Sequence, residues 1–184
     1  TQASQRQYSP RQRILMMIPV TLLFVVAIPY GLHAASVHLD RRLRLPRLHL
    51  GSLHALVSLG MIAGGWLLAM WAIMAQLTEG GGTPVPVMPT QRLLVRKPFS
   101  YCRNPMSLGA MVMYFGFGLW LGSWSSLGLV ALFSAVLLTY IKSIEEKELA
   151  GRFGTNYLAY KKATPFLLPR IWQTFVIQSR RKTA

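Results

Sequence analysis

The stretch RNPMSLGAMVMYFGFGLWLGSWSSLGLVALFSAVLLTYIKSIEEKEL, residues 103–149, decides the fold. It contains no Asp, Glu, Lys or Arg between Asn104 and Ile141. Glycine and serine residues at 122–126 interrupt this run and favour a turn. The stretch therefore predicts a tight antiparallel helical hairpin, with arms at Met106–Leu121 and Trp124–Ile141 whose outer ends come together.

The composition places the chain in a membrane. Of its 184 residues, 52% are hydrophobic and only 14% are charged, which is too apolar for an ordinary soluble domain. Two further uncharged stretches, Ile14–Leu32 and Leu50–Leu77, are each long enough for one span at about 1.5 Å per residue. We therefore predict an all-α integral membrane protein with about four transmembrane helices. The hairpin arms are short, so we expect them to be buried against neighbours or to lie in thinned bilayer.

Basic residues flank every apolar stretch and give a net charge of +15. Because they are spread over all juxtamembrane segments, anionic membrane lipid is a better partner for them than nucleic acid. Lysines and arginines on both sides of the hairpin predict that its ends face the cytoplasm. With four spans, the arginine-rich loop at 33–49 falls on the other side and breaks the positive-inside rule. Either this loop lies as an amphipathic segment against anionic headgroups, or the first hydrophobic stretch dips into the membrane and returns at Pro19 and Pro29.

The chain shows no internal repeats and is interpreted as a single membrane domain. Within it we distinguish N-terminal spans at 1–79, a second half at 80–170 and a basic tail at 171–184. The Gly- and Pro-rich stretch Thr78–Pro89 is either a lid over a site or a plain connector.

Three of the five acidic residues, Glu145, Glu146 and Glu148, follow the second hairpin arm. Carboxylates beside hydrocarbon are energetically costly, and they usually bind a charged partner or a ligand. Because adjacent residues diverge by about 100° around a helix, one of Glu145 and Glu146 can face the bundle while the other orients it or pairs with Arg103. The alternative is that both are solvated. At the start of the hairpin, Pro105 suits the first turn of a helix, whose free amides can meet an anion.

Several other residues could carry chemistry. Phe153-Gly154 predicts a helix stop, after which Tyr157 and Tyr160 follow on a short amphipathic helix and either line a pocket or form an interfacial belt, which composition favours. The histidines are His33, His38 and His49, expected in a loop, and His54, expected in a span. Their spacing does not predict a metal site. The single cysteine, Cys102, is interpreted as a small filler residue.

The second half of the chain, from about Gly80 to Pro169, resembles the isoprenylcysteine carboxyl methyltransferase and phospholipid methyltransferase superfamily. Its pattern is Arg-His/Asn-Pro-Met-Tyr-Leu-Gly, a helical hairpin, Glu-Glu-x-x-Leu, Phe-Gly-x-x-Tyr-x-x-Tyr and a closing Pro-x-x-Leu-Pro. The matching residues here are Tyr101, Arg103-Asn104-Pro105-Met106, Leu108-Gly109, Glu145-Glu146-Lys147-Glu148-Leu149, Phe153-Gly154, Tyr157, Tyr160 and Pro165 to Pro169.

The resemblance implies an S-adenosylmethionine-dependent methyltransferase that works in the membrane on a lipophilic acceptor, with its cofactor site facing the cytoplasm. Arg103 and Glu146 would be the catalytic residues. The cofactor-binding residues implied by the resemblance are Arg103, Asn104, Met106, Gly109, Glu145, Glu146, Tyr157, Tyr160 and Leu168. Met106 and Gly109 would line the cofactor channel. The half at 80–170 would bind the cofactor, and the spans at 1–79 would form the acceptor side. No metal is implied.

Two positions depart from the superfamily pattern. Ser107 replaces the usual Tyr, and Asn104 replaces the His of the protein-methylating members, so a general base at position 104 does not carry over. The acceptor stays open among an isoprenylcysteine carboxylate, a lipid and a thiol. Two other functions stay open as well, an NADPH-dependent membrane reductase of the sterol-reductase type and a non-catalytic scaffold. The Glu-Glu-x-x-Leu and Tyr-x-x-Tyr motifs favour the methyltransferase.

Overall fold

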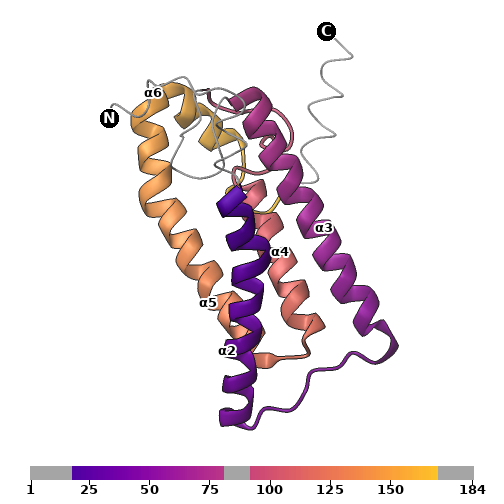
Figure 1. Ribbon diagram of the computed structural model, residues 1–184. Helices are drawn as coiled ribbons and strands as arrows, with labels where there is room; N and C mark the ends of the chain where they lie inside the picture. Colours follow the sequence, from indigo (N-terminus) through magenta and orange to yellow (C-terminus); the bar gives the residue numbers. More distant parts are fainter. Residues whose placement is uncertain (1–17, 81–91, 170–184) are drawn as a thin grey trace.

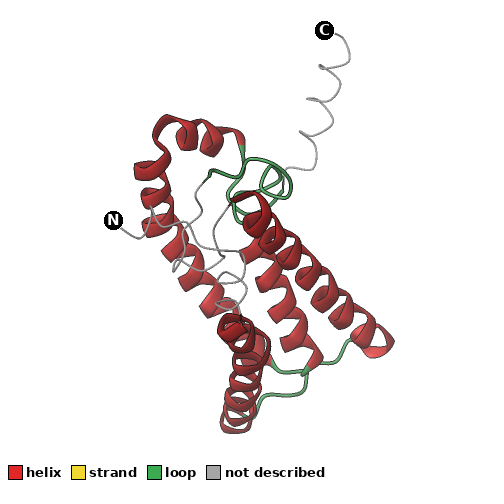
Figure 2. Ribbon diagram, turned by 45° about the horizontal axis from the view of Figure 1, so that its top comes forward, coloured by secondary structure: helices red, strands yellow, loops and turns green. Residues whose placement is uncertain are grey.

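The computed structural model describes residues 18–80 and 92–169, and these residues form helices without strands (Figures 1 and 2). The elements in chain order are η2 (Leu23–Ala27), α2 (Ile28–Leu43), η3 (Gly51–Leu53), α3 (His54–Ala75), η4 (Gln76–Gly80), α4 (Pro105–Trp120), α5 (Trp124–Tyr140), η5 (Ile141–Glu145) and α6 (Glu146–Ala163). The elements η2, η4 and η5 are π-helical turns within longer helices. The predicted all-α membrane fold is confirmed.

Three helical segments in the described part of the chain are long and apolar enough to cross a membrane, namely Ile18–Leu43, Gly51–Gly80 and Trp124–Ala163. The helix α4 has only 16 residues, so at about 1.5 Å per residue it falls short of a full hydrocarbon thickness. It is sheltered instead, because it packs along α3 and against α5. The expectation that a short hairpin arm is buried against its neighbours holds for α4.

Glycines let α3 and α4 approach until their backbones touch. A Cβ atom on Gly109 would lie 2.6 Å from the Ala69 nitrogen and 2.6 Å from the Gly65 oxygen, and one on Gly116 would lie 2.8 Å from the Ile62 nitrogen. Small residues are the usual means by which membrane helices pack closely. This contact fixes α4 and therefore the position of the residues at its N-terminal end.

The predicted hairpin turn is also present. The helix α4 ends at Trp120 and α5 begins at Trp124, with the Ser123 side chain accepting a hydrogen bond from the Ser126 amide. Two contacts hold this turn, one from α2 and one from the α2–α3 connection. Asp40 of α2 accepts a hydrogen bond from the Ser125 amide at 3.1 Å, and the Leu48 amide donates to the Gly122 carbonyl at 2.8 Å.

The sequence-based boundary of the first span is wrong. His33 and His38 were expected in a loop, but the helix continues through them to Leu43 and ends where Arg44 adopts the left-handed conformation with φ 51°. Residues with good helix propensity follow Leu32, and Asp40 is held by Ser125 of α5, so the helix has no reason to stop earlier. The arginines at 41–47 lie exposed at the opposite end of the bundle from the N-terminus of α4 (Figure 1).

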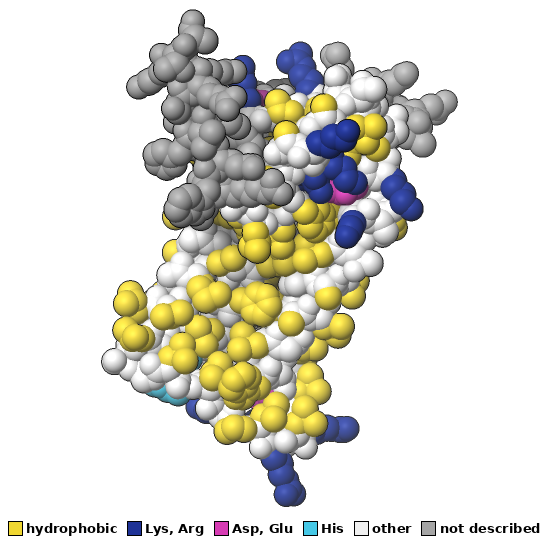
Figure 3. Space-filling model, turned by 180° about the vertical axis from the view of Figure 1, so that it is seen from behind, with side chains coloured by type: hydrophobic (Ala, Val, Ile, Leu, Met, Phe, Trp, Pro, Cys, Tyr) yellow, Lys and Arg dark blue, Asp and Glu magenta, His cyan; other side chains and the backbone are white. Residues whose placement is uncertain are grey.

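The surface agrees with a membrane position. Hydrophobic side chains cover the middle of the molecule in Figure 3, and the blue lysine and arginine side chains gather at its two ends. The residues that make up this belt include Leu56, Leu67, Leu132, Phe133 and Val136, all well exposed. Exposed aliphatic and aromatic side chains on this scale are expected where lipid is the solvent.

Candidate functional site

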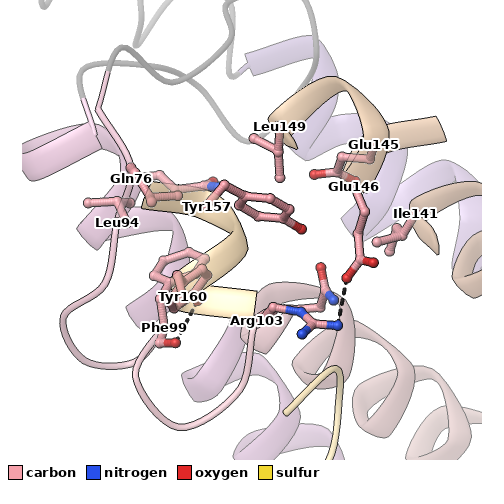
Figure 4. A pocket seen from close by; sticks show the side chains of 12 residues that line it. Gln76, Leu94, Phe99, Arg103, Ile141, Glu145, Glu146, Leu149, Tyr157 and Tyr160 are labelled. Atoms are coloured by element: carbon pink, nitrogen blue, oxygen red, sulfur yellow. Dashed lines mark hydrogen bonds and ion pairs between the residues drawn. The ribbon is translucent and has the colours of Figure 1, made fainter. Parts of the chain in front are cut away.

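A pocket lies at the end of the bundle where α4 begins and α6 crosses over (Figures 1 and 4). Its walls come from η4, the segment before α4, η5 and α6. The lining residues are Gln76, Leu93, Leu94, Phe99, Arg103, Asn104, Ile141, Glu145, Glu146, Leu149, Tyr157 and Tyr160. Six of the nine predicted site residues are therefore brought together at one place.

Glu146 is the most enclosed charge of the pocket, with 4% of its side chain exposed. It forms ion pairs with Arg103 and with Lys161, both at 2.7 Å. A buried carboxylate needs such partners, because an uncompensated charge there is strongly destabilising. The predicted pairing of the Glu-Glu motif with Arg103 is confirmed, with Glu146 as the paired residue.

Arg103 does more than neutralise Glu146. Its Nη1 donates hydrogen bonds to the carbonyl oxygens of Lys161 at 2.6 Å and Thr164 at 3.0 Å, and its backbone amide donates to Pro165 at 2.9 Å. The next residue, Asn104, donates from its side chain to the Phe166 carbonyl at 2.9 Å. The start of α4 and the end of α6 are thus joined, although they lie about 60 residues apart in the sequence.

These contacts show how much of each side chain is left for a ligand. The buried Nε of Arg103 has no hydrogen-bond partner among the described residues, and neither does the buried Oε1 of Gln76. Most native buried polar atoms are paired, so an unpaired one at a pocket marks a place where a ligand or water can bind.

Glu145 differs from Glu146 although the two are adjacent. It lines the pocket from the last residue of η5, its side chain is exposed, and it makes no ion pair with any described residue. Figure 4 shows both carboxylates on the side of the pocket opposite Gln76 and Leu94. Glu145 is therefore the acidic group of this pocket that is available to a cation.

The tyrosines of the Tyr-x-x-Tyr motif are pocket residues and not an interfacial belt, which corrects the reading that composition favours. Tyr157 is 2% exposed, and its ring lies 6.2 Å from that of Tyr160. The Tyr160 hydroxyl donates to the Phe99 carbonyl at 2.7 Å. The predicted break at Phe153-Gly154 is confirmed, because Gly154 has φ 54° within α6. Both tyrosine side chains lie at the pocket (Figure 4).

Three predicted site residues do not line this pocket. Gly109 packs against α3 as described above. Met106 packs on the apolar cluster of Ala72, Ala75 and Phe99. Leu168 is 72% exposed, beyond the end of α6. The cofactor roles of these three residues stay predictions that the fold does not favour.

Sequence reasoning missed four pocket residues that precede Arg103, namely Gln76, Leu93, Leu94 and Phe99, and one ion-pair partner, Lys161. Gln76 could have been noticed as the polar residue that ends a 22-residue apolar helix. The leucines and Phe99 have no motif of their own. The predicted lid or connector at Thr78–Pro89 continues as helix η4 to Gly80, and its remainder lies outside the described residues.

The histidines and Cys102, the other residues considered for chemistry, do not line the pocket. No group of three or more His, Cys, Asp or Glu residues that could hold a metal occurs within residues 18–80 and 92–169. Cys102 is 1% exposed, and this burial raises the pKa of its thiol. A buried, protonated thiol agrees with the interpretation of Cys102 as a filler residue.

The chain is similar to one known family of proteins. Residues 53–156 match the family model described as phospholipid methyltransferase. The matched region covers more than half of the chain. The chain belongs to the phospholipid methyltransferase family. No curated protein and no solved structure matches it significantly.

Membership in the phospholipid methyltransferase family indicates a membrane methyltransferase. The match begins at the junction of η3 and α3 and ends within α6, so it contains Arg103, Glu145 and Glu146. Tyr157 and Tyr160 follow directly after it. The matched region thus contains every residue that lines the pocket except these two tyrosines.

Proposed function

We propose that this chain is an S-adenosylmethionine-dependent methyltransferase that binds its methyl donor in the pocket between η4, the start of α4 and α6. The observation that carries the proposal is Glu145, an acidic side chain that lines the pocket without an ion-pair partner among the described residues. A carboxylate in this position suits a ligand with positive charge, and S-adenosylmethionine carries a sulfonium and an ammonium group.

The rest of the pocket fits the same ligand. Phe99 and Tyr157 supply buried aromatic surface for a purine ring, and the unpaired polar atoms of Gln76 and Arg103 can hydrogen-bond to neutral groups. When bound, S-adenosylmethionine would supply a methyl group that the acceptor displaces in line from sulfur. Such a reaction needs mainly positioning and a suitable electrostatic field.

The ion pairs of the pocket give each residue a separate role. Arg103 holds Glu146 and the last turn of α6, and so fixes the wall that carries both tyrosines. Lys161 balances the second oxygen of Glu146. Glu145 is left to orient a cationic ligand. Asn104 cannot act as a general base near neutral pH, so the acceptor should be one that needs little activation, such as a carboxylate, a thiol or a lipid amine.

The acceptor is proposed to be lipophilic and to approach from the bilayer, because the pocket lies at the end of membrane-spanning helices. An isoprenylcysteine carboxylate-like group, a lipid and a thiol are the candidate acceptors. Lysines and arginines surround this end of the bundle, so we propose that it faces the cytoplasm and lies against anionic lipid.

The proposal is tested by calorimetric titration of the detergent-purified full chain with S-adenosylmethionine and, in parallel, with NADPH. The account expects saturable binding of S-adenosylmethionine and none of NADPH, since the basic groups inside the pocket are already paired with Glu146. Binding of NADPH alone would move the chain to the reductases. Binding of neither compound would favour a non-catalytic scaffold.

A further inference from the structure

The side of the pocket opposite the carboxylates has its own chemistry. Gln76 is the first residue of η4 and shares this wall with Leu94 and Phe99 (Figure 4). Phe99 is 8% exposed and belongs, with Ala72 and Ala75, to the buried apolar cluster on which Leu94 packs. The Oε1 atom of Gln76 is buried at this place without a hydrogen-bond partner.

An unpaired amide oxygen in apolar surroundings is costly. Burial of a polar group without a partner destabilises a protein by about 1–3 kcal/mol, so natural sequences rarely keep one without a reason. Gln76 also begins a π-helical turn, and π-helical turns within α-helices are frequent at functional sites. Glu145, on the opposite wall, ends the other π-helical turn at the pocket. Gln76 and Glu145, two of the pocket's polar groups that remain available to a ligand, thus lie in π-helical turns.

The two walls differ in a way that matches the two halves of the proposed cofactor. The cationic half would be attracted to Glu145. The neutral heteroaromatic half would then lie across the pocket, against Gln76, Leu94 and Phe99 (Figure 4). A primary amide presents a donor and an acceptor in one plane, which is the arrangement that pairs with the amino group and a ring nitrogen of adenine.

We propose that Gln76 is a specificity-determining residue that accepts a hydrogen bond from the exocyclic amino group of the cofactor's adenine. This inference rests on the proposed function, because it assumes that an adenine-containing methyl donor binds here. It assigns to the last turn of the α3 segment a role in choosing the cofactor, although that segment precedes the Arg-Asn-Pro motif and belongs to the part of the chain interpreted as the acceptor side.

The test compares two ligands and three proteins by calorimetry. The ligands are S-adenosylhomocysteine and an analogue in which hydrogen replaces the purine amino group. The proteins are the full-length wild type, Gln76→Met, which keeps the side-chain length but removes the amide, and Thr78→Val as a control. Thr78 is exposed on the same helical turn, and its hydroxyl donates to the Met74 carbonyl of its own helix.

The wild type and Thr78→Val are expected to bind S-adenosylhomocysteine about five- to tenfold more tightly than the analogue, the usual range for one hydrogen bond. Gln76→Met should bind both ligands alike, with about the affinity that the wild type has for the analogue. A Gln76→Met protein that keeps the wild-type preference for the amino-bearing ligand overturns the inference.

If Gln76→Met does not fold, as judged by its melting temperature, Gln76→Glu replaces it, because a carboxylate still accepts a hydrogen bond from the amino group. That variant should keep the preference, and its loss would overturn the inference. Failure of the proposed function looks different, since the wild type would then bind neither ligand. Binding of S-adenosylhomocysteine without any preference in the wild type leaves the proposed function intact and removes only the role of Gln76.

Discussion

The contact between α3 and α4 and the pocket beyond its end are built on opposite principles. In the middle of the bundle, glycines bring two helices together until no side chain fits between their backbones. At the pocket, beyond the ends of these two helices, three polar groups have no partner among the described residues. They are the buried amide oxygen of Gln76, the buried Nε of Arg103 and the accessible carboxylate of Glu145 in η5.

The difference shows where rigidity is placed and for what purpose. Close packing of backbones resists deformation, so it holds Arg103 at a fixed distance from η4. Polar groups without partners lower the stability of the fold. They are expected where a bound ligand supplies the missing hydrogen bond or opposite charge. The closely packed contact between α3 and α4 therefore supports the pocket. Substitutions in the contact should mainly lower stability, and substitutions in the pocket should also lower ligand binding.

The largest effect is expected from Gly109→Leu, which places a side chain where the backbone of α3 lies. A Cβ atom at this position already falls 2.6 Å from the Gly65 oxygen, so the cost should exceed the about 1–3 kcal/mol typical of overpacking. Little monodisperse protein should survive in detergent, as size-exclusion chromatography and thermal melting would show. Gly128→Ala is the control, since its Cβ meets nothing within 4 Å. Equal melting of Gly109→Leu and wild type would contradict the close contact.

Removal of the Arg103 charge should come next. In Arg103→Leu, Glu146 keeps only Lys161, and breaking a buried ion pair costs about 3–5 kcal/mol. Both the melting temperature and S-adenosylmethionine binding should fall. Lys147→Leu is the control, because Lys147 is exposed and forms no ion pair with the described residues, so its loss should change stability by at most about 0.5 kcal/mol. Similar losses in the two variants would mean that the buried ion pair has no special role.

The Glu-Glu motif allows the comparison to be made between neighbours. Glu145→Gln should weaken S-adenosylmethionine binding by about tenfold or more and leave the melting temperature unchanged, since charge-assisted contacts contribute about 1.5–3 kcal/mol. Glu146→Gln should lower both quantities, because it leaves Arg103 and Lys161 without their shared carboxylate. If Glu145→Gln binds the ligand as tightly as the wild type does, Glu145 is not the group that meets the cation.

A smaller effect is expected for Tyr160→Phe. The variant loses the 2.7 Å hydrogen bond to the Phe99 carbonyl, a loss worth about 0.5–1.5 kcal/mol. Thermal melting against Tyr140→Phe, at an exposed position on α5, measures the difference. A Tyr160→Phe protein that is as stable as its control would show that this hydrogen bond does not help to hold the pocket wall.

The last prediction concerns the reactivity of the Cys102 thiol and not the stability or ligand binding of the protein. Because burial raises the pKa of its thiol, the reactive thiolate is scarcer at any pH below that pKa than it would be in an unfolded chain. Alkylation at pH 8 should therefore be much slower in the folded protein than in denaturant, as mass spectrometry can follow. Equal rates in the two states would show that the segment before α4 is open to solvent.

Much of this arrangement could be predicted from sequence where the signal is local or where two ends of a hairpin must meet. The apolar run at 104–141 with its Gly-Ser turn predicts α4 and α5, and antiparallel packing then brings Arg103 to Glu146. Gly154 itself indicates the break in α6, because glycine readily adopts the positive φ found there. The end of α2 was missed because Asp40 is held by Ser125, a contact between residues far apart in the sequence.

The pocket wall formed by Gln76 and Phe99 could not be predicted for a related reason. Its residues belong to no motif, and the direction of Gln76 depends on the π-helical turn that follows α3. Gly109 shows the converse, since a motif residue expected at the cofactor serves the contact with α3. Sequence patterns show which residues matter more reliably than they show which neighbour each residue meets.

The central claim is that the methyl donor binds at the end of the bundle formed by η4, the start of α4 and α6. Photocrosslinking of methyl-labelled S-adenosylmethionine to the purified full chain, followed by peptide mapping, tests it most directly. The account predicts label in peptides that contain Phe99, Tyr157 or Tyr160, reduced by excess S-adenosylhomocysteine. Label confined to peptides from the opposite end, around residues 41–53 or 120–126, would contradict it.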